Sequence, residues 1–368
     1  METHFSAFDH ACMAEALRLA EQGLYSTDPN PRVGCVLGRD GKLVGRGFHR
    51  KAGEAHAEVN ALHDAGRAAR GATAYVSLEP CSHTGRTPPC ADALIGAGVA
   101  RVIAAMQDPN PKVAGQGFDK LKAAGIETAC GLMETQARAL NPGFISRMRH
   151  GRPWVRSKLA VSLDGHTALG NGTSKWISAE AARKDAQHWR ARSSAILTGS
   201  GTVIADDPAL TVRLDGGEDN WRQPLRVVVD SALRIPPSAR LFKTPGQVCI
   251  ATLESEPQKH RPFVVAGATL LVTPAVDGHV DLAALMRRLA ERECNEVLVE
   301  AGPALNGALL QAGLLDELII YMAPHLLGDG ARGMFILPPI AQMRLRRELM
   351  LTDLRQVGGD IRMIFRPE

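Results

Sequence analysis

The chain has 368 residues, and at about 100–200 residues per domain this length predicts two domains. Hydrophobic residues make up 45% of the chain and charged residues 22%, an ordinary globular composition that excludes a disordered, collagen-like or coiled-coil protein. The formal net charge of +4 is spread along the sequence without a basic block, which argues against the concentrated basic surface of a nucleic-acid-binding protein.

The first half of the chain alternates helical and strand patterns. Predicted helices span residues 7–22, 56–70 and 90–97, and predicted strands span residues 32–38, 43–49, 72–78 and 101–106. Ser6 and Asp9 form a capping pattern before the first helix, and Asp40-Gly41 predicts a hairpin turn. Further helix and strand patterns run to about residue 148. The polar segment 148–153 contains Gly and Pro and predicts a boundary between domains 1–150 and 151–368.

The second half starts the alternation again. Predicted strands span residues 154–163, 195–198, 225–230, 247–252, 295–300, 318–322 and 361–365, and predicted helices span residues 178–192, 280–292 and 303–312. Both halves are therefore expected to be α/β domains.

The chain carries no sign of export or of membrane insertion. No apolar run approaches the about 18 residues of a membrane span, and the first residues lack the basic and apolar regions of a secretory signal. The chain has seven cysteines, which is an odd number, and no export signal. We therefore expect reduced thiols in the cytoplasm rather than a disulfide framework.

Three possible metal ligands stand out in the first half. His56 begins a predicted helix, Cys81 follows a predicted strand, and Cys90 begins the next helix. One imidazole and two thiolates would bind zinc tetrahedrally with one position open, the pattern of catalytic zinc sites. A helix N-terminus also favours the Cys90 thiolate. His56 and Glu58 would face the same site only if the helix begins at these residues. Glu58 would then move protons between the zinc-bound water and the substrate.

The spacing alone leaves several interpretations open. Eight residues separate Cys81 from Cys90, a looser spacing than the two to four typical of a structural zinc ribbon. A catalytic zinc site, a structural zinc site and a chance grouping are all compatible with these positions.

The pattern His56-Ala57-Glu58 followed by Pro80-Cys81 resembles the cytidine/deoxycytidylate deaminase superfamily, in which the Glu is the acid/base. The eight-residue gap between the cysteines departs from the C-x-x-C of that signature and counts against the nucleic-acid deaminases. Together with the Gly- and His-rich segment 45–56, the gap resembles the bifunctional riboflavin-biosynthesis deaminase/reductase family. The resemblance implies an N-terminal cytidine-deaminase-like α/β/α domain with Zn²⁺ and catalytic Glu58.

Four further residues are candidate substrate contacts in this half. His83 and Arg86 lie in a loop held at both ends by ligands, where their cations would suit a sugar phosphate. An exposed loop with incidental charges is the alternative. Asn30 and His49 suit a pyrimidine edge, or are simply turn and core residues.

The second half contains Gly-rich turns between strands and helices, at residues 199–202 and 300–303. Such turns can hold phosphate at a helix N-terminus, although the same glycines serve any tight turn. The dinucleotide-binding G-x-G-x-x-G pattern is not matched after Gly199, so a Rossmann domain is not expected.

Combined with other segments, these turns resemble the reductase domain of the same family, which is similar in fold to dihydrofolate reductase, over residues 154–365. The resemblance implies that NADPH contacts Ala160, Trp176, Thr202, Asp206 and Ser231 and, through its pyrophosphate, Gly302, Pro303, Ala304, Leu305, Asn306, Gly307 and Ala308. It implies substrate contacts by Ser174, Arg190, Leu210, Arg213 and Glu300, with Lys158 near the same anion. Without the resemblance, Arg190 is more simply a solvated helix charge.

The expected function is bifunctional. The first domain would hydrolytically remove the ring amine of a diaminopyrimidinone ribosyl phosphate, with Glu58 moving the proton from water to the departing nitrogen. The second would use NADPH to reduce the ribosyl to a ribityl chain. The expected substrate is then a small phosphorylated pyrimidine, and no nucleic-acid or membrane partner is expected. The chain is expected to form a homo-oligomer. Two alternatives are a tRNA or free-nucleotide deaminase with an unrelated second domain, and a non-enzymatic zinc module.

Overall fold

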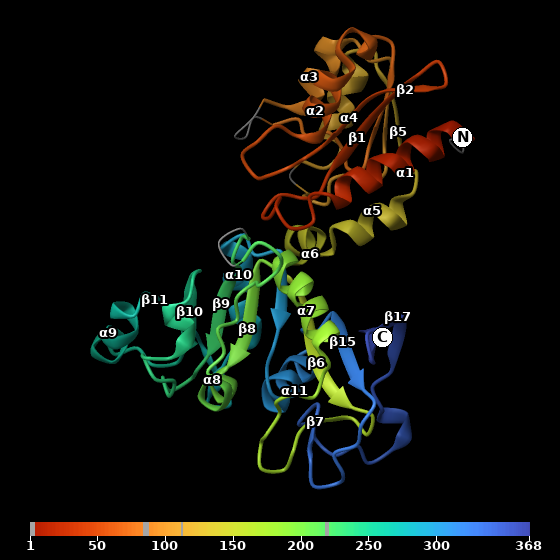
Figure 1. The fold of residues 1–368 in the computed structure, drawn as a ribbon. Coiled ribbons are helices and arrows are strands. Elements are labelled where there is room, and N and C mark those ends of the chain that lie inside the picture. The colour runs from red at the N-terminus through yellow and green to blue at the C-terminus, as the bar shows by residue number, and fades with distance from the viewer. Residues whose placement is uncertain (1–3, 84–87, 112, 218–220) are drawn as a thin grey trace. The chain divides into compact units, whose positions relative to one another are not determined.

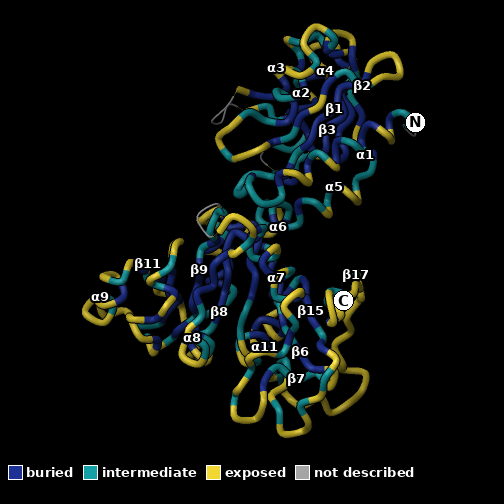
Figure 2. Tube along the Cα trace, viewed as in Figure 1, coloured by how far each residue is buried: buried dark blue, intermediate teal, exposed yellow. Residues whose placement is uncertain are grey.

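The computed structural model describes residues 4–83, 88–111, 113–217 and 221–368, and the chain divides into two compact units, Met1–Gly151 and Arg152–Glu368. Figure 1 shows that each unit is built on its own β-sheet, with helices packed against it. Buried residues follow the strands of both sheets, and exposed residues follow the loops and the last strands (Figure 2). No helix in the described ranges is long and apolar enough to cross a membrane.

The first unit is a three-layer α/β/α domain. Its described strands form a sheet of order β2-β1-β3-β4-β5, in which β1 is antiparallel to β2 and β3, while β3, β4 and β5 are parallel. The strands are β1 (Gly34–Arg39), β2 (Lys42–Phe48), β3 (Thr73–Val76), β4 (Arg101–Ala104) and β5 (Glu127–Cys130). The helices are α1 (Ala7–Glu21), α2 (Ala57–Ala65), α3 (Cys90–Ala97), α4 (Gln116–Ala123), α5 (Glu134–Leu140) and α6 (Pro142–His150).

Two separate apolar clusters hold these layers together. One joins α1 and α5 to the sheet through Cys12, Met13, Tyr75 and Ile103, and the other joins α2, α3 and α4 to the opposite face. The predicted cap of the first helix is present, because Ser6 Oγ accepts a hydrogen bond from the Asp9 N–H.

Glycines of β2 bring α2 close to the sheet. A Cβ on Gly47 would lie 2.4 Å from Ala61 N and 2.5 Å from Ala57 O, and one on Gly45 would lie 2.5 Å from Ala61 O. Any larger residue would therefore push the helix away. This contact fixes the first turn of α2, where His56 and Glu58 lie.

The second unit contains a nine-stranded sheet in the part of the chain that the structure describes, of order β11-β10-β9-β8-β14-β6-β15-β18-β17. Strands β11 through β15 in this order are parallel, and β18 and β17 are antiparallel. The strands are β6 (Trp154–Ser162), β8 (Ala195–Gly199), β9 (Leu225–Val229), β10 (Val248–Thr252), β11 (Ala268–Val272), β14 (Glu296–Val299), β15 (Glu317–Ala323), β17 (Leu349–Val357) and β18 (Asp360–Pro367). Parallel strands end at one edge of the sheet, where ligand sites of α/β folds lie.

The connections of this unit include helices and two small ribbons. The helices are α7 (Glu180–Arg192), α8 (Ser200–Asp206), α9 (Pro257–Val265), α10 (Leu282–Glu291) and α11 (Pro303–Gln311). One ribbon pairs β12 (Ala275–Val276) with β13 (His279–Val280), and the other pairs β7 (His166–Ala168) with β16 (Arg332–Gly333).

Sequence patterns and structure differ at several elements. The predicted helix 56–70 ends at Ala65, because Gly66 has a φ of 53° and the chain continues as a 3-10 turn, Gly66–Ala69. The patterns do not predict α8, α9, β11 or β17. Helix α9 carries Pro262 inside it, and β17 is exposed along most of its length, so neither shows the usual periodicity.

Candidate active sites

The three predicted metal ligands of the first unit lie together. Their candidate ligand atoms are all within 4.8 Å of one another, and His56 Nδ1 is 3.2 Å from Cys90 Sγ and 3.6 Å from Cys81 Sγ. His56 precedes α2 and Cys90 is the first residue of α3. Hydrogen bonds from the Cys90 thiol and from His56 hold the pKa of the Cys81 thiol below its usual value.

This donor set fits a zinc ion. One imidazole nitrogen and two thiolates are the protein ligands of a class of catalytic zinc sites in which the fourth position is left for water or substrate. Among the described residues, the group contains no fourth His, Cys, Asp or Glu side chain. His56, Cys81 and Cys90 would therefore hold the zinc, with one position open.

Glu58 lies beside these ligands and is only 3% exposed. His56 has extended backbone angles, φ −73° and ψ 166°, while Glu58 is in the first turn of α2, so both side chains reach the same site. Burial and, to a lesser extent, the charge of Cys81 raise the pKa of Glu58 to about 7, although a hydrogen bond with Cys90 opposes this shift. A carboxyl group that titrates near neutral pH can both accept and donate a proton.

Asn30 and His49 also lie next to the ligand group. The His49 ring packs edge-on against the His56 ring at a centroid distance of 5.2 Å. His49 Nδ1 pairs with Ala55 O at 3.1 Å, and its Nε2 pairs with Asn30 Nδ2 at 3.1 Å. Burial lowers the pKa of His49, which favours its neutral form. Of the two predicted loop cations, His83 is exposed and Arg86 lies outside the described residues.

One important residue was not predicted from the sequence. Glu79 is 4% exposed, and its carboxylate accepts hydrogen bonds from the backbone N–H groups of Asp108, Gly115 and Gly117 at 2.9–3.0 Å. It stands two residues before Cys81, so it ties the segment 108–117 to the ligand loop. A charged residue immediately before Pro80-Cys81 is the signal that could have identified it.

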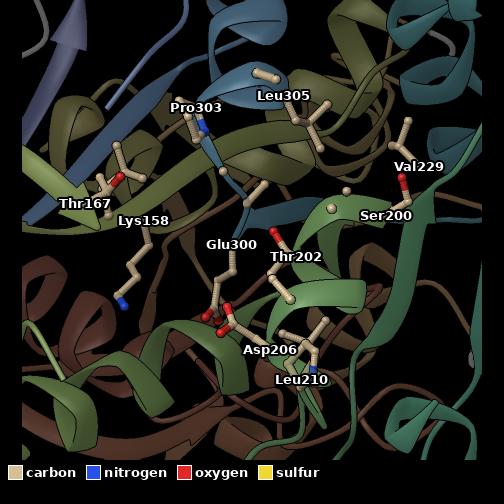
Figure 3. A pocket seen from close by; sticks show the side chains of 18 of the residues that line it. Lys158, Thr167, Ser200, Thr202, Asp206, Leu210, Val229, Glu300, Pro303 and Leu305 are labelled. Atoms are coloured by element: carbon tan, nitrogen blue, oxygen red, sulfur yellow. The ribbon is translucent and has the colours of Figure 1, made fainter. Parts of the chain in front are cut away.

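The second unit has a cavity of about 1630 Å³ at the carboxyl edge of its parallel strands. Figure 3 shows Lys158 and Thr167 at one side of it, Ser200 and Val229 at the other, and Glu300, Thr202 and Asp206 between them. The predicted residues that line it are Lys158, Ala160, Ser174, Trp176, Arg190, Thr202, Asp206, Leu210, Arg213, Ser231, Glu300, Gly302, Pro303, Ala304, Leu305 and Ala308.

Two predicted cofactor contacts do not line this cavity. Asn306 is fully buried, and its amide group donates to Ala301 O and Gly302 O and accepts from Ser157 Oγ. A Cβ on Gly307 would lie 2.0 Å from Ile336 O, so this glycine faces the packed side of α11. Both residues therefore face packed protein and support the first turns of α11 from inside.

Arg190 and Glu300 form an ion pair in the cavity wall. Arg190 Nε and Nη2 donate to the Glu300 carboxylate at 2.6 and 2.9 Å, and Nη1 donates to Thr211 O at 2.8 Å. Burial would raise the pKa of Glu300, but the charge and hydrogen bonds of Arg190, together with the charges of Lys158 and Arg213, outweigh it and lower the pKa to about 2. Burial lowers the pKa of Lys158, although the negative charge of Glu300 opposes this shift. Arg190 is thus not the solvated helix charge expected without the resemblance.

The start of α11 offers an anion site. Gly302 is its N-cap and Pro303 its first residue, and no side chain caps the helix. The unpaired backbone N–H groups of this turn and the helix dipole favour a phosphate group. The residues therefore fit the pyrophosphate of a nicotinamide dinucleotide.

Two family models match the chain. The RibD C-terminal domain matches residues 153–363, and the cytidine and deoxycytidylate deaminase zinc-binding region matches residues 6–106. The riboflavin biosynthesis protein RibD of Escherichia coli K12 is 52% identical over 362 residues, which are 96% of this chain and 98% of that protein. The chain belongs to the RibD family.

Other RibD proteins are also similar to this chain over nearly its whole length. RibD of Haemophilus influenzae is 50% identical over 99% of each chain. The structure of Acinetobacter baumannii RibD, form 1, matches with a TM-score of 0.91 and 46% identity over 98% of this chain and 99% of that one. A Thermotoga maritima diaminohydroxyphosphoribosylaminopyrimidine deaminase/5-amino-6-(5-phosphoribosylamino)uracil reductase matches with a TM-score of 0.85 and 31% identity over 98% and 99% of the two chains.

As a member of the RibD family, the chain is a bifunctional deaminase and reductase that uses zinc and NADPH. The predicted fold class, a deaminase-like domain followed by a reductase domain, is confirmed. The alternative of a tRNA or free-nucleotide deaminase with an unrelated second domain is not supported, since the second half matches the reductase domain of the same family.

Proposed function

We propose that residues 1–150 deaminate a diaminopyrimidinone ribosyl phosphate and that residues 151–368 reduce the ribosyl of the product to a ribityl chain with NADPH. The observation that carries this proposal is the His56–Cys81–Cys90 group with Glu58 buried against it, on the same chain as a large cavity that is lined by the N-terminus of α11. The activity named for the Thermotoga maritima relative supports the same pair of substrates.

In the deamination, Glu58 carries the proton. A zinc ion at the site supplies Lewis acidity that activates water for attack. Glu58 takes a proton from the water that adds to the amine-bearing ring carbon, and it delivers that proton to the nitrogen, which leaves as ammonia. The raised pKa of Glu58 suits both transfers. Asn30 and His49 lie beside the ligands and would hold the pyrimidine edge, with His83 and Arg86 on its phosphate.

In the reduction, the residues of the second unit position two molecules. NADPH supplies the hydride when bound. The first turn of α11 would hold its pyrophosphate, and Ala160, Trp176, Thr202, Asp206 and Ser231 would line its path. Lys158, Arg190 and Arg213 supply positive charge around Glu300 for the substrate phosphate, while Ser174 and Leu210 line the same cavity.

The test combines two measurements on the purified full-length chain. Metal analysis should find one zinc per chain, and NADPH oxidation should require either pre-deaminated substrate or prior turnover of the aminopyrimidine. Oxidation of NADPH by the aminopyrimidine without ammonia release would contradict the proposed order of reactions.

We further propose that the enzyme is a cytoplasmic homo-oligomer that does not act on nucleic acid. All seven cysteines are free, which suits a reducing compartment. The edge strand β17 exposes Met350, Leu351 and Leu354, each about half or more exposed, and a second copy would cover this apolar edge. Light scattering after chromatography should therefore give a multiple of 39.4 kDa, and Leu354→Lys should lower it.

A further inference from the structure

Several positively charged side chains, from different elements, line the reductase cavity. Lys158, Arg190 and Arg213 surround Glu300, since all three act on the charge of its carboxylate. Arg234 and Arg240 line the cavity from the segment that follows β9. Figure 3 shows Lys158 and Ser200 on opposite sides of the cavity with Glu300 between them, and Arg234 is hydrogen-bonded to Ser200. Arg234 therefore lies on the Ser200 side of the cavity, and Lys158 lies on the other side.

Arg234 is arranged to bind an anion. Its Nη2 donates to Ser200 Oγ at 2.8 Å, and its Nε lies 3.9 Å from Asp230 Oδ1. The side chain is 65% exposed and lines the cavity, so the remaining N–H donors of the guanidinium are accessible to a ligand. A guanidinium with free donors on one edge can bind a phosphate group through two parallel hydrogen bonds.

The acidic residue of this turn is directed away from the cavity. The Asp230 side chain is fully buried, and its Oδ2 accepts a hydrogen bond from the Ile235 N–H at 2.9 Å. Asp230 is not among the residues that line the cavity, although Ser231 and Arg234 are. A carboxylate here would favour a ribose hydroxyl group and repel a ribose phosphate, whereas an arginine does the opposite.

The position of Ser200 relates Arg234 to the cofactor. Ser200 is the first residue of α8, and a Cβ on the preceding Gly199 would lie 3.7 Å from Leu305 in the first turn of α11. The Arg234–Ser200 pair thus lies next to the turn that would hold the pyrophosphate. The pyrophosphate is common to NADPH and NADH, so the helix N-terminus cannot distinguish the two cofactors.

We propose that Arg234, held by Ser200, binds the 2′-phosphate of NADPH and makes the second unit select NADPH over NADH. This inference rests on the proposed NADPH-dependent reduction. It assigns a specificity role to a residue outside the predicted contact set, and it leaves the hydride transfer itself unchanged.

Calorimetric titration of the full-length protein tests the proposal without turnover. The ligands are NADPH, NADH, 2′,5′-ADP and 5′-AMP, and the variants are Arg234→Ala and Arg234→Lys, with Arg261→Ala on α9 as an exposed control. Arg234→Ala should weaken binding of NADPH and 2′,5′-ADP by about 10- to 100-fold, the range for one charged hydrogen-bonding partner, and leave NADH and 5′-AMP unchanged. Arg234→Lys should lie between, because an ammonium keeps the charge but not the two-bond geometry.

The outcomes distinguish an error in the proposed reductase function from an error in the role of Arg234. If the wild-type protein binds neither NADPH nor NADH, the proposed reductase function is wrong and this inference falls with it. If the wild type prefers NADPH and Arg234→Ala keeps the same preference, only the role of Arg234 is overturned. Equal weakening of NADPH and NADH would also overturn it, since that is the result of a structural defect. Unchanged binding in Arg261→Ala is the expected control.

Discussion

Glu79 Oε1 accepts a 2.9 Å hydrogen bond from the backbone N–H of Gly117, which lies 38 residues further along the chain. A Cβ on Gly117 would lie 2.0 Å from Pro80 O, so only glycine permits the segment to approach this closely. The contact fixes the backbone on which Cys81 stands. Glu79 is therefore a positioning residue of the metal site.

Glu79→Gln should destabilise the first unit and lower its zinc affinity. The amide has one acceptor oxygen in place of two, so one backbone N–H would lose its partner, at a cost of about 1–3 kcal/mol. Urea unfolding and competition with a zinc chelator measure the two effects. Glu127→Gln, at an exposed ion pair with Arg101, is the matched control and should change neither. Equal behaviour of the two variants would contradict the positioning role.

Cys81→Ser and Cys90→Ser should each lower the zinc content. A hydroxyl group is a poorer zinc ligand than a thiolate, and each substitution leaves two good ligands. Elemental analysis of the purified variants measures the effect, and deamination should fall in parallel. Cys130→Ser, at an exposed cysteine outside the group, should keep full zinc. Full zinc retention in both ligand variants would remove this site.

Glu58→Gln should lower deamination by about 10²- to 10⁴-fold, the usual contribution of general acid–base catalysis. The amide keeps the size of the side chain but cannot carry the proton. Ammonia release measures the loss, and zinc content should stay at the wild-type level because Glu58 is not among the three grouped ligands. NADPH oxidation with pre-deaminated substrate should remain near normal, and its loss in a folded protein would point to a shared site.

Arg190→Ala should have the reverse effect. It removes a cation from the reductase cavity and leaves Glu300 without its partner, so we expect kcat/KM of the reduction to fall by about 10- to 100-fold. Deamination should be unaffected, because its residues lie in the other unit. Lys184→Ala, at an exposed position of the same helix, is the control and should leave both reactions unchanged. Fluorescence of the four tryptophans, all in the second unit, checks that this unit stays folded.

The Arg190–Glu300 pair should also be visible in the pH dependence of stability. The folded protein lowers the pKa of Glu300 from 4.5 to about 2, so the pair stabilises the fold above pH 4.5 and loses its effect as the pH falls toward 2. The full contribution is about 3 kcal/mol. Urea unfolding followed by tryptophan fluorescence should show a steeper loss of stability between pH 5 and 2 in wild type than in Glu300→Gln. Parallel curves would contradict the shifted pKa.

Much of the first site could be predicted from local sequence. His56, Cys81 and Cys90 stand at the starts of helices or after a strand, and the α/β order brings such positions to one side of a sheet. The family resemblance then indicated their chemistry. The contact of His49 with Asn30 and His56 could not be derived, because it depends on the register of β2 against β1 and on the close packing of α2.

The sequence by itself determined the class of each domain and the family, and it predicted the zinc ligands and the acid/base, since short motifs and periodicity carry that information locally. The tertiary structure decided which charges neutralise one another. It paired Arg190 with Glu300, turned Asn306 and Gly307 inward, gave Glu79 its backbone partners, and left Arg234 facing a cavity while Asp230 was buried. These contacts are between residues that are far apart in the sequence. They could not be predicted from local sequence, because burial and electrostatics act only on groups that the fold has already brought together.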